Sequence, residues 1–442
     1  MSATSLTEQL VQDLAKPITP SVEELAALHV LDWLATAIGA LGTEEGQLLS
    51  QYVNNRPTGC CHAIGCGRRD SAIAAFSNAG LSIILELDDL HLGARLHPAD
   101  VVVAAALACA ERENSSGNDL LQAVIRGYEV MIRVGESVGD AHYRFWHNTS
   151  TCGPFGAAAA VAGLLGLDDE ATVNALGNAG TQSSGLWQCR LERTMSKPIH
   201  AGRAAEAGLL AADLAALGVT GPRFILEGEL GLFAATSPDA DPVAISRPAE
   251  GWKLEETAFK PWATCGHANA AIDATLSLRE SVSVDAIQKI HVRTYEQAVV
   301  FADCPDPRTT YDAKFSIQHA VAVALVGDLS PKEFEAEYLD HPQVRQLREK
   351  VQLEVGDGPN SSKDSAWGAH VSVMTDGGTE EAICDNPKGS PANPMSADEV
   401  VAKANALLAE AGLEPREADA LVEAVLDLAS GGDLGQVVSR IP

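Results

Sequence analysis

The sequence predicts a mainly helical protein that combines a large all-helical domain with a smaller α+β, lid-like domain. Up to about residue 250, segment after segment places apolar residues at helical spacing. Short segments that alternate apolar and polar residues appear only after about residue 280, and two amphipathic segments follow them. We therefore expect a helical domain over 1–270 and 393–442, and the α+β domain over 271–392.

The helices of the first domain are predicted from apolar periodicity and from residues that favour helix starts. Ser21 and Asp70 can act as N-caps, and Pro98 and Asp100 fit the first turn of a helix. Abundant Ala and Gly would let these helices pack closely, and no strand is expected among them. The predicted helices cover residues 21–40, 71–89, 97–111, 116–139, 153–167, 169–180 and 200–218.

The second domain is predicted from three strand patterns and a hairpin. Residues 287–295 and 351–355 alternate, and 370–375 meet 376–384 through Asp376-Gly377-Gly378, a hairpin signal. Helices are expected between these strands and after a Pro/Gly/Ser-rich linker at 386–396. They cover residues 315–327, 342–350, 396–413 and 417–430.

Composition narrows the possible partners. Lys plus Arg number 31 against 60 Asp plus Glu, so the net charge of −29 disfavours nucleic acid and anionic membranes as partners. We expect no membrane-spanning helix and no secretory signal, and hence a cytoplasmic protein. Nine scattered cysteines predict reduced thiols, and the group Cys60, Cys61, His62 and Cys66 lacks zinc-site spacing. Nucleotide, P-loop, nucleophile-elbow and zincin motifs are absent from the sequence.

Polar clusters interrupt the apolar helices, and the first lies at 86–98. Acidic residues at the end of a predicted helix oppose its dipole, which favours a functional role over a solvated helix end. A metal site from Asp88, Asp89, His91 and His97 matches no strong ligand template, so we predict no metal. A second cluster lies at the start of a predicted helix and contains Lys197, His200 and Arg203. The free N–H groups of a helix N-terminus, together with Lys and Arg, can bind a carboxylate or a phosphate. The other residues of interest are His147, Lys260, Cys265, His267 and His319.

Five spaced motifs resemble the MmgE/PrpD family, which includes 2-methylcitrate dehydratases, cis-aconitate decarboxylases and iminodisuccinate epimerases. They occur in family order over roughly residues 20–330 and read ELDDLHLGARLHPAD, GPFGAAAAVAGLLGL, SKPIHAGRAAEAGLLAADLAALGVTGP, FKPWATCGHANAAIDA and AKFSIQHAVAVAL. The resemblance implies a helical domain with a smaller α+β domain, a homodimer, no cofactor and a small di- or tricarboxylate substrate. Carried over by motif, the site residues are His97, His147, Lys197, Lys260 and either Asp88 or Asp89.

Three departures from the family pattern bear on the reaction. Glu86 stands where the eliminating branches have Asp, His319 where the family usually has Tyr, and Asn269 where a His is often found. An imidazole at His319 could serve a second face of the substrate carbon, so we expect an epimerase of the iminodisuccinate type. A 2-methylcitrate-type dehydratase, a cis-aconitate-type decarboxylase, a non-catalytic scaffold and a metal-dependent hydrolase remain as alternatives.

The resulting assignment has two parts. The predicted catalytic residues are His97, His147, Lys197, Lys260 and His319. The predicted substrate-binding residues are Glu86, Asp88, Asp89, His200, Arg203, Cys265 and His267.

Overall fold

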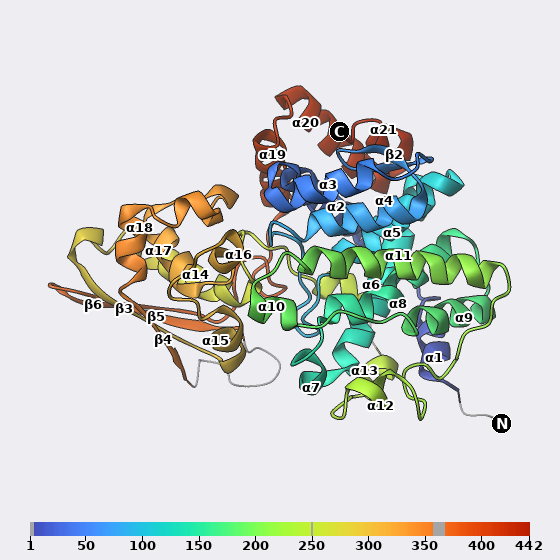
Figure 1. Cartoon of the computed structure of the whole chain (residues 1–442), viewed down its shortest axis with the longest axis horizontal. Coiled ribbons are helices and arrows are strands. Elements are labelled where there is room, and N and C mark those ends of the chain that lie inside the picture. Colours follow the sequence, from blue (N-terminus) through green and yellow to red (C-terminus); the bar gives the residue numbers. More distant parts are fainter. Residues whose placement is uncertain (1–3, 249–250, 357–366) are drawn as a thin grey trace. The chain divides into compact units, whose positions relative to one another are not determined.

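The structure, a computed structural model, describes residues 4–248, 251–356 and 367–442. These residues form two compact units, each with its own interior (Figure 1). Unit 1 comprises Met1–Ile84, Asp88–Phe259 and Ser396–Pro442, and unit 2 comprises Leu85–Leu87 and Lys260–Met395. The mainly helical class with a smaller α/β part is confirmed. The division into a helical domain over 1–270 and 393–442 and an α+β domain over 271–392 stays a prediction.

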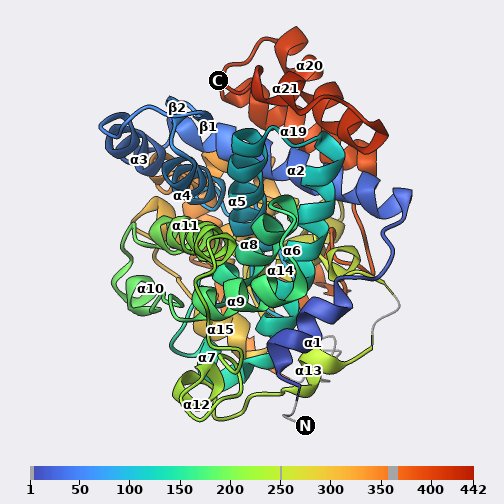
Figure 2. The same ribbon diagram turned by 90° about the vertical axis from the view of Figure 1, so that its right-hand side faces the viewer.

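Unit 1 is built from helices, with α5, α6, α8 and α11 packed against one another at its centre (Figure 2). Nearly every residue of α5 and α8 is buried, which explains their apolar, Ala-rich sequences. The helices are α1 (Leu6–Asp13), α2 (Pro20–Gly39), α3 (Glu44–Asn54), α4 (Ser71–Ser82), α5 (Pro98–Glu113), α6 (Gly117–Ser137), α7 (Gly139–Tyr143), α8 (Asn148–Leu164), α9 (Asp169–Gly180), α10 (Gln188–Glu192), α11 (Lys197–Ala216), α12 (Leu232–Thr236), α13 (Val243–Ser246), α19 (Ala397–Glu410), α20 (Pro415–Leu426) and α21 (Leu434–Val438).

Small residues set the separation of the central helices. A Cβ atom built on Gly156 of α8 would lie 2.8 Å from the carbonyl oxygen of Gly127 in α6. A Cβ atom on Gly208 of α11 would lie 2.3 Å from the Cβ of Ala157 in α8. Larger side chains at these glycines would push the helices apart, so the close packing expected from the Gly and Ala content is present.

The segment after α4 departs from the prediction. The helix expected over 71–89 ends at Ser82, although Asp70 does cap its start. Glu86 and Arg95 have φ angles of 55° and 52°, so the chain here turns as a loop rather than continuing as helix. The first polar cluster therefore lies on a loop that leads into α5.

Two other local expectations are wrong. Thr19, not Ser21, is the N-cap of α2, because Pro20 occupies the first helical position. The first part of the chain also contains a short antiparallel ladder of β1 (Cys61–Ala63) and β2 (Gly67–Arg69), whose three-residue strands are too short to show alternation.

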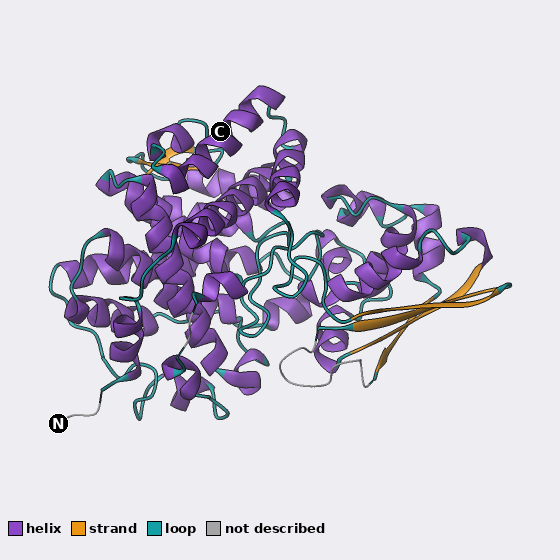
Figure 3. Ribbon diagram, turned by 180° about the vertical axis from the view of Figure 1, so that it is seen from behind, coloured by secondary structure: helices purple, strands orange, loops and turns teal. Residues whose placement is uncertain are grey.

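Unit 2 contains a four-stranded sheet in the order β4-β3-β5-β6 (Figure 3). Strands β3 and β4 are parallel, whereas β5 pairs antiparallel with both β3 and β6. Helices α14 and α17 pack on the sheet, and the alternating burial of β3 reflects its one covered face. The elements are α14 (Asn269–Leu278), β3 (Ile287–Thr294), α15 (Glu296–Ala302), α16 (Thr310–Lys314), α17 (Ile317–Val326), α18 (Pro342–Arg348), β4 (Val351–Val355), β5 (Ala369–Thr375) and β6 (Gly378–Cys384).

One helical stretch has the length and apolar composition needed to cross a membrane. It covers Pro20–Gly42, and 72% of its most apolar window is buried inside the protein. The expectation that no helix is long and apolar enough to span a membrane is therefore wrong as far as length and composition are concerned. Its burial among other helices of unit 1 explains the apolar sequence as that of a core helix.

The C-terminal helices return to unit 1 and are tied there by a buried ion pair. Helix α19 packs along α2, and Lys403 Nζ lies 2.7 Å from Asp32 Oδ1 (Figure 1). Burial raises the pKa of Asp32, and the ammonium of Lys403 acts in the opposite direction. Removing the ammonium would leave a carboxylate buried without its cation, which is costly.

We predict that Lys403→Met lowers the free energy of unfolding by about 3–5 kcal/mol at neutral pH. Without the ammonium, the pKa of Asp32 in the folded protein rises further above its unfolded value. A carboxyl with a raised folded pKa loses stabilising free energy as pH increases, so the destabilisation should be smaller near pH 5 than near pH 8. Urea unfolding at both pH values measures this.

The matched control is the double variant Asp32→Asn with Lys403→Met, which removes both charges. It should recover part of the lost free energy of unfolding. Its destabilisation relative to the parent protein should be the same near pH 5 and near pH 8. Equal destabilisation by the single and double variants would contradict the role given to the ion pair.

Candidate functional site

His97 is held at the entrance to α5, where it is the N-cap residue. Its Nδ1 lies 2.6 Å from Asp88 Oδ2 and 2.8 Å from the carbonyl oxygen of Asp89. Because both neighbours are acceptors, we assign the proton to Nδ1. The lone pair of Nε2 is then available for proton transfer, as in other carboxylate-oriented histidines. The side chain of His97 remains 12% exposed.

Asp89, in contrast, holds the loop against the helices. Its Oδ1 accepts from the backbone N–H of Ala99 in the first turn of α5. Its Oδ2 accepts from the hydroxyl of Tyr128 at 2.7 Å and lies 2.9 Å from Nδ1 of His29. These contacts use both oxygens of Asp89, so the structure gives this residue a scaffold role rather than the predicted contact with substrate.

His147 occupies the equivalent place on a second helix, as N-cap of α8. Its Nδ1 lies 3.2 Å from Nδ1 of His200, so one ring donates a hydrogen and the other accepts it. The centroid of its ring is 6.4 Å from that of His97. Burial lowers the pKa of His147 well below its usual range and lowers that of His200 to about 4. Both imidazoles are therefore neutral at neutral pH in the unliganded protein.

Lys197 begins a third helix, α11, and is buried. Its ammonium adds to the effect of burial in lowering the pKa of His147 and of His200. The helices α5, α8 and α11 all contact one another, and the backbone N–H of His97 donates to Thr149 Oγ1 in the first turn of α8. Three helix N-termini, each with a basic side chain, are thus brought together in unit 1. Partial positive charge from the helix dipoles and the ammonium favours an anion here.

Two of the predicted residues pair in unit 2. Lys260 Nζ lies 3.4 Å from Glu86 Oε2, and both side chains are almost fully buried. His267 is stacked on Trp367 with ring centroids 4.4 Å apart, and its Nδ1 lies 2.6 Å from the hydroxyl of Tyr295. Cys265, next to this group in sequence, is buried and its backbone N–H donates to the carbonyl oxygen of Lys314.

His319 does not have the surroundings of an acid or base that acts on substrate. Its Nε2 lies 2.8 Å from the carbonyl oxygen of Glu333, and Arg348 donates to its Nδ1 at 3.4 Å. The ring is fully buried in unit 2, and burial lowers its pKa to about 4. These contacts indicate a neutral imidazole that joins α17 to the segments after it, in place of the catalytic role that the sequence suggested.

Arg203 also lies away from the group of histidines. Its side chain is 54% exposed and pairs with Glu206 one turn along α11. Its predicted contact with substrate therefore finds no support in its surroundings.

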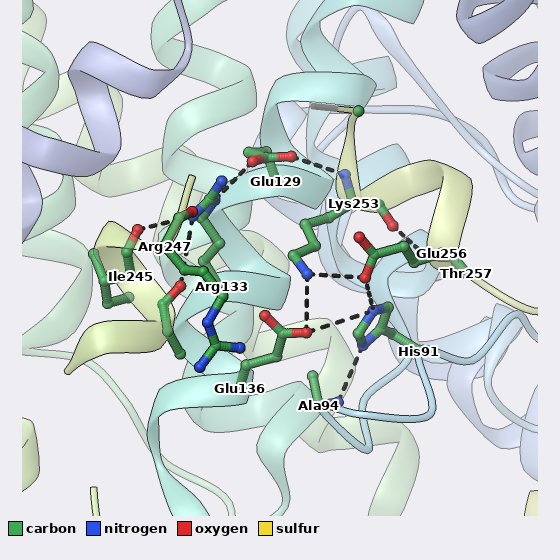
Figure 4. Close-up of polar contacts among 12 residues, drawn as sticks. His91, Ala94, Glu129, Arg133, Glu136, Ile245, Arg247, Lys253, Glu256 and Thr257 are labelled. Carbon is green, nitrogen blue, oxygen red and sulfur yellow. Dashed lines mark hydrogen bonds and ion pairs between the residues drawn. The ribbon is translucent and has the colours of Figure 1, made fainter. Parts of the chain in front are cut away.

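The acidic residues near His91 form a separate network (Figure 4). His91 Nδ1 accepts from the backbone N–H of Ala94, and Nε2 lies 3.6 Å from Glu256 and 3.9 Å from Glu136. Lys253 lies between the two carboxylates, at 3.1 Å from Glu136 and 2.8 Å from Glu256. The interaction with His91, with help from Lys253, lowers the pKa of Glu256 to about 2. The ammonium of Lys253 thus already balances the negative charges of Glu136 and Glu256.

Of the four residues weighed as a metal-ligand set, Asp88 and His97 lie together, and the other two have different partners. His91 belongs to the network with Lys253, and the oxygens of Asp89 are engaged with Ala99, Tyr128 and His29.

Sequence reasoning missed several residues of the group in unit 1. Gly185, with φ 102°, accepts the backbone N–H of His147, and a Cβ atom there would lie 2.5 Å from Ser150. Trp187 covers His147 at 4.4 Å between ring centroids. Asp100 was interpreted only as an acid in a first helical turn, yet it is fully buried. The presence of an acid inside an otherwise apolar helix was the signal that could have identified Asp100.

We predict that Lys197→Met raises the pKa of His200 from about 4, because the ammonium no longer opposes the imidazolium. Titration of ¹⁵N-labelled histidine by NMR measures this change. Arg416→Met removes a positive charge from an exposed position in unit 1, on α20, which packs on α2 and α19, and should leave His200 unchanged. An equal shift in both variants, or none in Lys197→Met, would contradict the placement of Lys197 beside the two imidazoles.

The chain is similar to two family models and to individual known proteins. Residues 6–244 match the MmgE/PrpD N-terminal domain, and residues 262–428 match the MmgE/PrpD C-terminal domain. A cis-aconitate decarboxylase-like protein of Aspergillus oryzae is 29% identical, over 87% of this chain and 85% of the relative. The cis-aconitate decarboxylase of Homo sapiens is 28% identical, over 87% and 83%. A mitochondrial 2-methylcitrate dehydratase of Yarrowia lipolytica is 28% identical, over 59% and 52%.

These relatives are named as enzymes that act on small carboxylic acids, and the two matched domain models together cover most of the chain. The family resemblance seen in the sequence motifs is thereby confirmed. The chain belongs to the MmgE/PrpD family.

Proposed function

We propose that this protein is a polycarboxylate lyase that needs no cofactor and whose proton steps are carried by His97. The observation that carries the proposal is the arrangement of His97 in unit 1. Its Nδ1 is fixed by Asp88, and it lies at a helix N-terminus beside two neutral imidazoles. A buried ammonium and dipole ends suit an anionic substrate, and a carboxylate-oriented imidazole suits proton transfer.

Local charge must overcome the field of the whole protein, since the net charge is −29. Lys197 and the N-termini of α5, α8 and α11 supply this locally positive region. A bound carboxylate would favour the protonated form of the neighbouring imidazoles, so the pKa of His147 and of His200 should rise in the complex. Neutral histidines in the empty site can thereby become hydrogen-bond donors to a bound acid.

Decarboxylation is the reaction named for relatives that match over 87% of this chain. In such a step the bond to one carboxylate carbon breaks and carbon dioxide leaves, while the electron pair stays on the carbon skeleton next to a remaining carboxylate. That skeleton then takes up a proton. His97 in its imidazolium form, balanced by Asp88, can supply the proton from Nε2. Lys197 and the helix ends stabilise the negative charge on the retained carboxylate.

Dehydration is the second candidate, favoured by the similarity to a 2-methylcitrate dehydratase. Here neutral His97 would take a proton from the carbon beside a carboxylate, and a hydroxyl would leave as water after it gains a proton. The epimerase predicted from the sequence depended on His319 as a second acid or base. The burial and contacts of His319 remove that support, so a lyase is the better proposal.

We predict that His97→Ala and Lys197→Ala each lower kcat/KM by at least about a hundredfold, the usual scale for a lost acid–base or charge-stabilising group. His91→Ala is the matched control, because His91 lies on the same loop but in the network with Lys253. It should keep its activity within a few-fold. A rate close to that of the parent protein in both His97→Ala and Lys197→Ala would place the site elsewhere.

We predict that the protein converts an unsaturated or hydroxylated tricarboxylate with loss of carbon dioxide or water. Cis-aconitate, 2-methylcitrate and stereodefined iminodisuccinate are each incubated with the enzyme in heavy water, after dialysis against chelator. Mass spectrometry and NMR distinguish the outcomes. Release of carbon dioxide with deuterium in the product supports decarboxylation, and a new double bond with loss of water supports dehydration. Inversion of a stereocentre without loss of mass would overturn the lyase proposal.

A further inference from the structure

A second carboxyl group lies behind the one that orients His97. Asp100, in the first turn of α5, is fully buried, and the hydroxyl of Ser82 donates to its Oδ1 at 2.6 Å. Its carboxyl group lies close to that of Asp88. An oxygen of each acid and a ring nitrogen of His97 all lie within 4.8 Å of one another. Ser82, Asp100, Asp88 and His97 thus form a continuous chain of polar groups.

Two buried carboxyl groups in contact cannot both be ionised at low cost, so one of them retains a proton. Burial raises the pKa of Asp100 well above its usual range, and the negative charges of Asp88 and Asp89 add to this. The groups that face Asp100 are these two acids, the ring of His97 and, from α6, the hydroxyl of Tyr128. The ring of His97 stabilises the charge on Asp88 instead, which leaves the proton on Asp100.

We propose that Asp100 is a positioning residue that holds its proton at neutral pH and donates it to Asp88, so that Asp88 stays an ionised neighbour of Nδ1 of His97. The inference rests on the proposed role of His97 in catalysis. Nothing in the chain of contacts requires Asp100 to touch substrate.

The test compares Asp100→Asn with Asp100→Leu. The amide of Asn can donate to Asp88 through its NH₂ group and accept from Ser82 through its oxygen, as a protonated carboxyl does. We expect Asp100→Asn to keep kcat within about threefold, and Asp100→Leu to lose roughly ten- to hundredfold in kcat with little change in KM.

The ¹⁵N chemical shifts of the imidazole of His97 give a readout that does not need activity. They should report the Nδ1–H tautomer in the parent protein and in Asp100→Asn, and a mixture of tautomers in Asp100→Leu. If Asp100→Leu does not fold, Ser82→Ala replaces it, and a change in the same direction is expected.

Three results would overturn the inference. An Asp100→Asn variant as impaired as Asp100→Leu would mean that Asp100 acts as an ion. Unchanged ¹⁵N chemical shifts of His97 in Asp100→Leu, or in Ser82→Ala where that variant replaces it, would make Asp100 a packing residue. Failure of the parent protein to act on any tricarboxylate would refute the proposed function alone, since the ¹⁵N chemical shifts still test Asp100.

Discussion

Close contact among α5, α8 and α11 is the constraint on which the candidate site depends. Glycine and alanine at the contact surfaces allow backbones to approach so far that a single added Cβ atom would collide with a neighbouring helix. The approach places the N-termini of these three helices together, and His97, His147 and Lys197 begin them. Packing of small apolar residues therefore decides the electrostatics of a polar site.

The site brings together buried charged groups, each of which would be costly to bury without the others. Buried acids stand near His97, a buried ammonium stands near two imidazoles, and burial keeps those imidazoles neutral. Such an arrangement is pre-organised for an anion, because fixed helix dipoles and an ammonium take the place of the water that solvates the free anion. A chain with a large excess of negative charge needs this local concentration if it is to hold a polycarboxylate.

The loop between α4 and α5 has two separate roles, and neighbouring residues divide them. Asp89 uses its oxygens on Ala99 and Tyr128, which anchors the loop to α5 and α6. Asp88 instead faces His97. His91 turns into a network with Lys253 that joins the loop to the segment before Phe259. Scaffold and chemistry are thus interleaved residue by residue, which explains why sequence motifs alone mark the whole loop as important.

The sequence by itself determined the helical character, the α+β part, the hairpin at Asp376-Gly377 and the family, because periodicity, turn residues and spaced motifs are local properties. It also identified His97, His147 and Lys197 as candidates. Only the tertiary structure distinguished Asp88 from Asp89, assigned His319 and Arg203 to other contacts, and placed Asp100 behind His97. Those distinctions depend on which side chains meet across helices far apart in the chain. Burial and partner, not residue type, decide whether an acid or an imidazole performs chemistry or supports the fold.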